Sequence, residues 1–372
     1  MPENQNSTTD LHINQFASDQ KDKYNRFVLS HADSNPLQLW EWGEIKGSRS
    51  WSVERLGFWE GKKLIGVAQV LKRAITFRFC MYYIPYGPLF DWENEKQAAE
   101  LLGLLKQYYK ENASAKTLFL KIEPRIKETK SVTDILKAEG FVSVTPSVQP
   151  KHTAIVDLSK SADEIFSSFE KDTRYSIRRA EREEVGVQIF TNPLNIQPVK
   201  EFYSLYKLTS VRGRFVARPL TQFEKMWTAL APENRVAVYE AWFKDKILAA
   251  AFVLKLKPKA FLVYAGSLRD ESVKNKFPTY LVQWKIIESL KKEGFTSYDL
   301  WGISPDTDPT HSWAGHTLFK RGFGGEEITF AGSYDYPLSP LYRVFNRANK
   351  LRYFLSKIKT VTIKSNIKTP TK

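Results

Sequence analysis

The sequence predicts an α/β protein made of two tandem copies of one unit, and three observations support this. The chain has 372 residues and a mass of 43.0 kDa, more than one hydrophobic core ordinarily supports. It is 42% hydrophobic and carries 24 Phe, 17 Tyr and 10 Trp, which excludes a mainly disordered protein. Two long stretches also repeat the same order of expected elements, so we predict two similar domains.

Each copy starts with two strands, continues with a helix and a third strand, and ends with a Gly-Phe step. In the first copy these segments are 66–75, 79–91, 98–111, 116–124 and 136–142. In the second copy they are 247–257, 260–268, 278–294, 297–303 and 317–325. Matching residues keep nearly the same spacing: Gly87 and Gly266 lie 179 positions apart, Leu120 and Asp299 also 179, and Gly140 and Gly322 182. We therefore predict a duplicated unit.

The helix of the second copy is predicted from its periodicity. Apolar residues recur every three positions, at Leu281, Trp284, Ile287 and Leu290. Pro278 suits a first helical turn, and Gly294 suits a left-handed cap beyond the end. The strands are apolar throughout, which is typical of sheets that are covered on both faces.

Charge and composition limit the classes of function. The net charge is +15, which favours anionic partners such as nucleic acid, phosphorylated substrates or a membrane face. Cys80 is the single cysteine and the five histidines are scattered, so we expect no disulfide within the chain and no metal site.

The polar N-terminus has no apolar core that would mark a secretory signal. We expect residues 1–20 to be disordered. The longest apolar run is the eight residues from 247 to 254, far below the roughly 20 of a spanning helix, and it predicts a buried strand. A cytoplasmic protein is expected.

Seven stretches, in order from 37 to 338, carry a resemblance to a known family. They are QLWEWGEIK at 38–46, IPYGPLFD at 84–91, FEKDTRYSIRRAEREEVGV at 169–187, LYKLTSVRGRF at 205–215, FLVYAGS at 261–267, SYDLWGI at 297–303 and FKRGFGG at 319–325. Together they resemble the FemABX family of peptidoglycan-bridge aminoacyltransferases. The long helical arm of the three-gene staphylococcal type is missing, so the compact FemX-like form is the nearer match.

This resemblance implies two acetyltransferase-like (GNAT) domains, at 1–150 and 151–325. Residues 326–372 would form a return segment and a basic amphipathic helix packed on the first domain. The implied reaction moves an amino acid from aminoacyl-tRNA, the co-substrate, to the stem peptide of a nucleotide-linked or lipid-linked peptidoglycan precursor. No other cofactor is implied. With a lipid-linked acceptor, the enzyme would also touch the inner face of the membrane.

The resemblance also implies a binding site for the precursor. Lys46 and Arg212 match positions that grip its diphosphate, for which a point charge and a planar guanidinium are suited. Tyr86 and Asp91 fall where the family places further precursor contacts. Asp91 follows a Gly-Pro turn, so capping the next helix is an equal alternative for it.

Tyr264, Phe319 and Lys320 match the end of the site where the reaction occurs. An ammonium at Lys320 would stabilise the negative charge that develops on the ester carbonyl oxygen. No general base is evident, and Asp299 and Asp306 are candidates by nearness in sequence alone.

Two basic segments remain open between alternatives. Between 169 and 187, basic side chains form one stripe of a predicted helix, which suits an RNA backbone or simply a solvated face: Lys171, Arg174, Arg178 and Arg182. Residues 336–372 hold nine Lys or Arg and no Asp or Glu, with an apolar stripe at Leu341, Phe345, Ala348, Leu351 and Leu355. This helix suits an anionic membrane, tRNA, or packing on the body with a solvated outer side.

Two other functions fit the same fold. An acyl-CoA-dependent N-acyltransferase would need an Arg/Gln-x-x-Gly-x-Gly/Ala loop for the coenzyme A pyrophosphate. RGFGGE, at 321–326, departs from that pattern at its last position. A non-catalytic relative that binds RNA or membrane is the second alternative.

Overall fold

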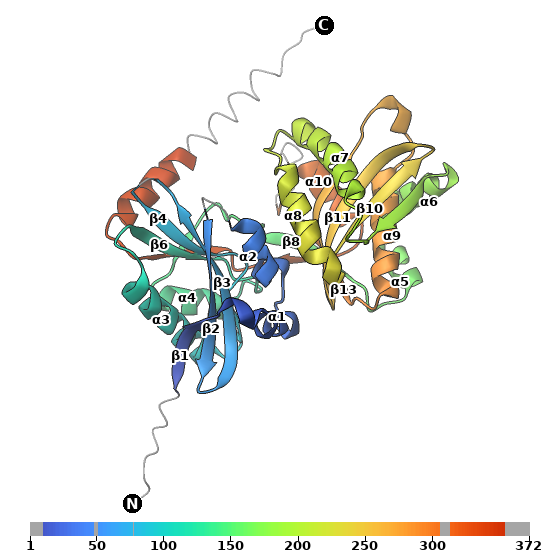
Figure 1. The fold of residues 1–372 in the computed structure, drawn as a ribbon. Coiled ribbons are helices and arrows are strands. Elements are labelled where there is room, and N and C mark those ends of the chain that lie inside the picture. The colour runs from blue at the N-terminus through green and yellow to red at the C-terminus, as the bar shows by residue number, and fades with distance from the viewer. Residues whose placement is uncertain (1–9, 48–50, 77, 306–312, 354–372) are drawn as a thin grey trace, which may run out of the picture.

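The computed structural model describes residues 10–47, 51–76, 78–305 and 313–353. Two α/β units lie side by side, the first blue to teal and the second green to orange (Figure 1). After the second unit the chain returns to the first, where the last of the described residues form a red helix. No helix among the described residues has the length and apolar character needed to cross a bilayer.

The first unit is an eight-stranded sheet with helices on its faces. Its strands are β1 (Leu11–Gln15), β2 (Trp51–Glu60), β3 (Lys63–Ala74), β4 (Cys80–Ile84), β5 (Leu89–Phe90), β6 (Thr117–Ile122), β7 (Val142–Val144) and β15 (Ser333–Pro337). Its helices are α1 (Lys21–Ser30), α2 (Trp40–Lys46), α3 (Glu95–Asn112) and α4 (Lys130–Ala138). The strand order is β1-β2-β3-β4-β6-β15-β7, and β5 pairs with β3.

The second unit is a seven-stranded sheet. Its strands are β8 (His152–Asp157), β9 (Gly186–Phe190), β10 (Val236–Phe243), β11 (Lys246–Leu256), β12 (Lys259–Ser267), β13 (Ser297–Gly302) and β14 (Glu326–Thr329). Its helices are α5 (Ala162–Ser168), α6 (Lys171–Arg182), α7 (Gln197–Gly213), α8 (Leu220–Leu230), α9 (Pro278–Lys292) and α10 (Ala314–Arg321). The order is β14-β8-β13-β12-β11-β10-β9.

The predicted duplication is confirmed strand by strand. In the first unit β2, β3 and β4 are antiparallel, and α3 then leads to β6, which is parallel to β4. In the second unit β10, β11 and β12 are antiparallel, and α9 leads to β13, which is parallel to β12. The helix prediction also holds, since α9 begins at Pro278 and Gly294 follows it with φ +78°.

Chain ends and boundaries differ from the expectation in two places. Residues 11–15 form an edge strand paired with β2, and a 3-10 turn follows at 18–20, so residues 11–20 are ordered. The second unit continues beyond 325, because β14 pairs with β8 in its sheet. The return therefore starts at β15, which pairs with β6 and β7 of the first unit.

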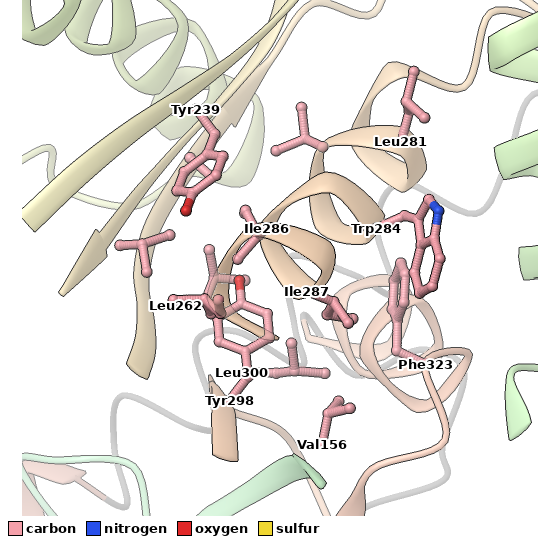
Figure 2. Packing of buried hydrophobic residues seen from close by; sticks show 14 of the residues in the cluster. Val156, Tyr239, Leu262, Leu281, Trp284, Ile286, Ile287, Tyr298, Leu300 and Phe323 are labelled. Carbon is pink, nitrogen blue, oxygen red and sulfur yellow. The ribbon is translucent and has the colours of Figure 1, made fainter. Parts of the chain in front are cut away.

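Three large cores hold these layers together. One lies between α9 and the second sheet, where Tyr239, Leu262 and Tyr298 lie around Ile286, and Trp284 lies beside Phe323 (Figure 2). A second lies between the first sheet and the two helices α3 and α4, which cover one face of that sheet. The third joins α7 and α8, on the other face of the second sheet, to α1, α2 and β3 of the first unit. The second sheet is thus covered on both faces, and the two units share a continuous apolar interface.

Candidate active site

Helix α2 places Lys46 at the interface between the units, and a buried carboxylate anchors that helix. Glu41 accepts hydrogen bonds from the side chain of Asn25 on α1 and forms ion pairs with Lys21 (2.9 Å) and Arg235 of the second unit (3.4 Å). Its side chain is almost fully buried, and burying a charge is tolerated when it is paired in this way. Helix α2 is therefore held by both units.

Lys46 ends α2 in a partly buried, cationic setting. Its Nζ lies 5.0 Å from the centre of the Trp42 ring. Burial, together with the nearby charge of Arg218, lowers the pKa of Lys46 to about 8. Residues close in sequence to Lys46 and Arg218 line a groove of about 520 Å³ between α2 and α8. Among them are Glu44, Ile45 and Thr221.

Arg218, rather than Arg212, is the cation that the structure brings to Lys46. Arg212 instead donates hydrogen bonds to the Ser267 carbonyl (3.1 Å) and to Thr209 Oγ1 (3.2 Å). Arg214 (φ +52°) caps α7, so Arg212 lies in the last turn of that helix and Arg218 in the segment that leads to α8. The expected contact of Arg212 with the diphosphate stays a prediction, and Arg218 is a further cation beside Lys46.

The end of β12 connects the two cationic regions. Tyr264 lies beside Arg218, and burial raises the pKa of its hydroxyl to about 12. Gly266 follows, and a Cβ at Gly266 would lie 2.4 Å from the Tyr206 backbone nitrogen. Only glycine allows α7 to approach β12 this closely. Ser267, which holds Arg212, completes the strand.

Lys320 lies on the last turn of α10, next to the end of β13. Its Nζ donates a hydrogen bond to the Gly302 carbonyl (2.7 Å). Burial lowers the pKa of Lys320 to about 8, while Asp299 opposes that shift. Phe319, beside it, packs on Tyr280 with ring centres 4.9 Å apart. A partly desolvated cation thus sits where the resemblance predicts the reaction.

Sequence reasoning missed two residues near Lys320. They are His316, one turn before Lys320 on α10, and Arg269, two residues beyond β12. Burial lowers the pKa of His316, and the charges of Lys320, Arg269 and Arg212 lower it further. The imidazole is therefore neutral at pH 7. The four-residue spacing of His316 and Lys320, which places both on one face of a helix, was the sequence signal that could have identified His316.

Tyr86 and Asp91 do not join this group. Tyr86 is buried in the interface between the units, where its hydroxyl donates a hydrogen bond to the Pro150 carbonyl (2.8 Å). Asp91 is exposed and accepts hydrogen bonds from the backbone of Glu93 and Asn94, before α3. The N-cap of α3 is Asn94, so Asp91 holds the turn before the helix and does not cap it, and its contact with the precursor stays a prediction.

The candidate bases are also placed differently. Asp299 forms a buried ion pair with Arg125 of the first unit and accepts a hydrogen bond from Thr153. It therefore ties the two units together. Asp306 lies outside the described residues.

Helix α6 presents the predicted basic stripe along a surface hollow of about 910 Å³. Its lining is Lys171, Arg174, Tyr175, Arg178, Glu181 and Arg182. Two of the four basic residues have local partners. Arg174 donates to the carbonyls of Ser167 and Phe169, and Arg178 lies 5.3 Å from the Phe166 ring centre.

Helix α6 begins directly beside the end of α10. The Glu170 backbone N–H donates to the Gly322 carbonyl (2.9 Å), two residues after Lys320. The start of α6 and the end of α10 are therefore neighbours.

The fold and this arrangement define a protein with two fused acetyltransferase-like units. The crystal structure of FemX is similar over 90% of this chain and 100% of that chain, with a TM-score of 0.78 and 21% identity. A tandem GNAT protein from the clavulanic acid biosynthesis pathway is similar over 89% of this chain and 99% of that chain, with a TM-score of 0.52 and 9% identity.

The profile of the FemAB family matches residues 20–245 and 238–350, so the chain belongs to the FemAB family. The lipid II:glycine glycyltransferase of Staphylococcus epidermidis is 23% identical over 91% of this chain and 96% of its own length. The enzyme of the same name from Staphylococcus aureus is 24% identical over 91% and 96%. The family and the fold class predicted from the sequence are confirmed.

Proposed function

We propose that this protein is an aminoacyltransferase that adds an amino acid from aminoacyl-tRNA to the stem peptide of a peptidoglycan precursor, and that the precursor is lipid-linked. The observation that carries the proposal is a series of cations that follows the end of β12. It begins at Lys46 and Arg218, continues through Arg212 and Arg269, and ends at Lys320. Membership of the FemAB family and the names of its relatives support the acyltransferase class.

The precursor would bind at the interface between the units. Its diphosphate concentrates negative charge, which Lys46 and Arg218 match with an ammonium and a guanidinium. The adjacent groove between α2 and α8 offers room for the parts of the precursor beyond the diphosphate. From there the end of β12 points the stem peptide toward Lys320.

Transfer would occur at Lys320. The acceptor amine attacks the ester carbonyl, a C–N bond forms, and the bond from the carbonyl carbon to the ribose oxygen breaks. With a pKa of about 8, Lys320 stays mostly protonated at pH 7 and stabilises the oxyanion. The neutral imidazole of His316 can take the amine proton and pass it to the ribose oxygen as that oxygen leaves.

The donor would approach along α6. Lys171 and Arg182 are exposed at the two ends of the basic hollow, and Tyr175 between them is 53% exposed. Cations with an exposed aromatic ring suit an RNA backbone and an unstacked base. Because α6 begins beside α10, RNA on this helix would deliver its aminoacylated end to Lys320.

The test is to incubate the purified protein with charged tRNAs and a lipid-linked muramyl-pentapeptide, and to determine the product mass. We expect the acceptor to gain the mass of an amino acid only when charged tRNA is present. A nucleotide-linked acceptor in a parallel reaction tests the lipid preference. Transfer from acetyl-CoA instead, or tRNA binding without any transfer, would contradict the proposal.

A further inference from the structure

The C-terminal helix at residues 342–353 touches the body along a single side. Tyr342 and Phe345 each lie 5.5 Å from Phe119 of β6, measured between ring centres. The Tyr342 hydroxyl also donates a hydrogen bond to Asp335 (3.0 Å). Farther along, Asn349 and other residues of this side border a groove against the first unit. The C-terminal helix therefore packs on the first unit, as expected, through the side that carries Tyr342 and Phe345.

A second side of the helix is apolar and faces solvent. Leu341, just before the first turn, is 50% exposed, Val344 is 68% exposed and Leu351 is 59% exposed, and Ala348 between them is also exposed. At about 100° per residue these four positions form one continuous stripe, roughly 120° around the helix from Tyr342 and Phe345. Of the apolar stripe predicted from the sequence, Leu341, Ala348 and Leu351 are turned outward, whereas Phe345 packs on Phe119 and Leu355 lies outside the described residues.

Basic side chains border this outward stripe. Arg343, Arg347 and Lys350 form the third side of the helix, and all three are exposed. Arg352 follows on the opposite edge of the apolar stripe. The 37 residues from 336 to 372 contain nine Lys or Arg and no Asp or Glu, so no acidic side chain offsets this charge locally.

We propose that this helix is a docking surface for an anionic phospholipid membrane. An exposed apolar stripe with basic borders is the arrangement that lets a helix lie in the headgroup region. The apolar residues enter the acyl boundary while the cations meet lipid phosphates. The inference deepens the proposed function and rests on it for one point, that the acceptor is carried by a lipid. The docking itself follows from the exposed helix.

The experiment is flotation of the full-length protein, without substrates, with vesicles of phosphatidylglycerol and phosphatidylcholine in equal parts. One variant combines Val344→Asp with Leu351→Asp, and another combines Arg347→Glu with Lys350→Glu. All four side chains are exposed, so the fold should persist. Because each cation near such a surface adds about 1 kcal/mol, we expect the charge reversal to weaken binding by at least about 20-fold.

Matched controls place the same changes elsewhere on the surface. Leu194→Asp alters a side chain that is 93% exposed in the loop before α7. Lys62→Glu with Lys63→Glu reverses two exposed lysines at the β2–β3 turn. The controls should float like the wild type, and pure phosphatidylcholine vesicles should bind none of the proteins.

Three results would overturn the proposal: wild-type protein that does not float, helix variants that float like the wild type, and helix variants that lose tRNA binding but still float. Transfer to a nucleotide-linked acceptor is measured separately. It should be equal in the wild type and the helix variants. Flotation is read without substrate, so failure of the transfer reaction leaves the membrane result intact.

Discussion

The two units share one architecture but carry different side chains at matching positions. Ala138 ends α4 two residues before Gly140, whereas Lys320 lies on α10 two residues before Gly322. The two copies thus share the scaffold, while the cation at Lys320, for which we propose the catalytic role, belongs to the second copy.

The units also treat buried charges differently. In the first unit the Glu123 carboxylate accepts hydrogen bonds from the Tyr83 hydroxyl and from the backbone of Val148. In the second unit the Glu240 carboxyl is fully buried without a hydrogen-bond partner, and Lys320 has the Gly302 carbonyl as its acceptor. Buried groups that lack full compensation cost stability and are common at functional sites.

The largest expected effect comes from removing Lys320, the cation that the second unit has and the first unit lacks at the matching position. Lys320→Ala should lower kcat about 100-fold, because one oxyanion donor contributes roughly that factor. The KM for the precursor should change little, since Lys46 and Arg218 remain. Steady-state kinetics with charged tRNA checks this, with Lys137→Ala at the corresponding end of α4 as control. Equal kcat in Lys320→Ala and wild type would refute the role.

The next effect tests the proposed precursor site, to which the first unit contributes Lys46 and the second contributes Arg218. Lys46→Ala or Arg218→Ala should each raise the precursor KM about tenfold, because each removes a charge-assisted contact to phosphate. Arg212→Ala, in the last turn of α7, is the matched control and should raise the KM less, since its guanidinium donates a hydrogen bond to the Ser267 carbonyl. A larger effect of Arg212→Ala would restore the pairing expected from sequence.

A pH series sharpens the assignment of Lys46. Its pKa of about 8 means that its positive charge is lost as the pH rises through 8. The precursor KM should therefore rise above pH 8. Lys46→Arg keeps its charge, so its KM should stay nearly constant to pH 9 or so. Parallel KM curves for the two proteins would contradict this assignment.

The smallest effect concerns stability rather than catalysis. Burial raises the pKa of Glu240 from 4.5 to about 8, and the charge of Glu201 adds to the shift. The unfolded chain loses the Glu240 proton near pH 4.5, whereas the folded protein keeps it up to about pH 8. The free energy of unfolding therefore falls as the pH rises from 4.5 to 8. Glu240→Gln removes that loss, and its melting temperature at pH 8 should exceed that of the wild type by a few degrees.

Thermal unfolding at pH 5 and at pH 8 measures this difference, which should grow with pH. Glu233→Gln changes a carboxylate that is 61% exposed and serves as control. A constant offset between Glu240→Gln and wild type at both values would show that the Glu240 carboxyl does not titrate in this range.

Sequence reasoning predicted the repeated unit because helix periodicity, and the nearly equal spacing between matching residues of the two copies, can be read from residue order alone. It also reached Lys46 and Lys320 because each lies within a continuous motif. It assigned Arg212 and Tyr86 from their positions in family motifs, which do not show the contacts that each side chain makes. Ser267 accepts a hydrogen bond from Arg212, and Tyr86 is buried against Trp301 and Phe330 of distant segments.

The sequence by itself determined the two-copy α/β design, the family and the basic character of the C-terminal segment, because these depend on residue order and composition. The tertiary structure decided which cations share a site, how the strands β8 and β15 fill corresponding slots in the two sheets, and which side of the last helix faces solvent. Those features depend on contacts between residues far apart in the chain, which local patterns do not encode.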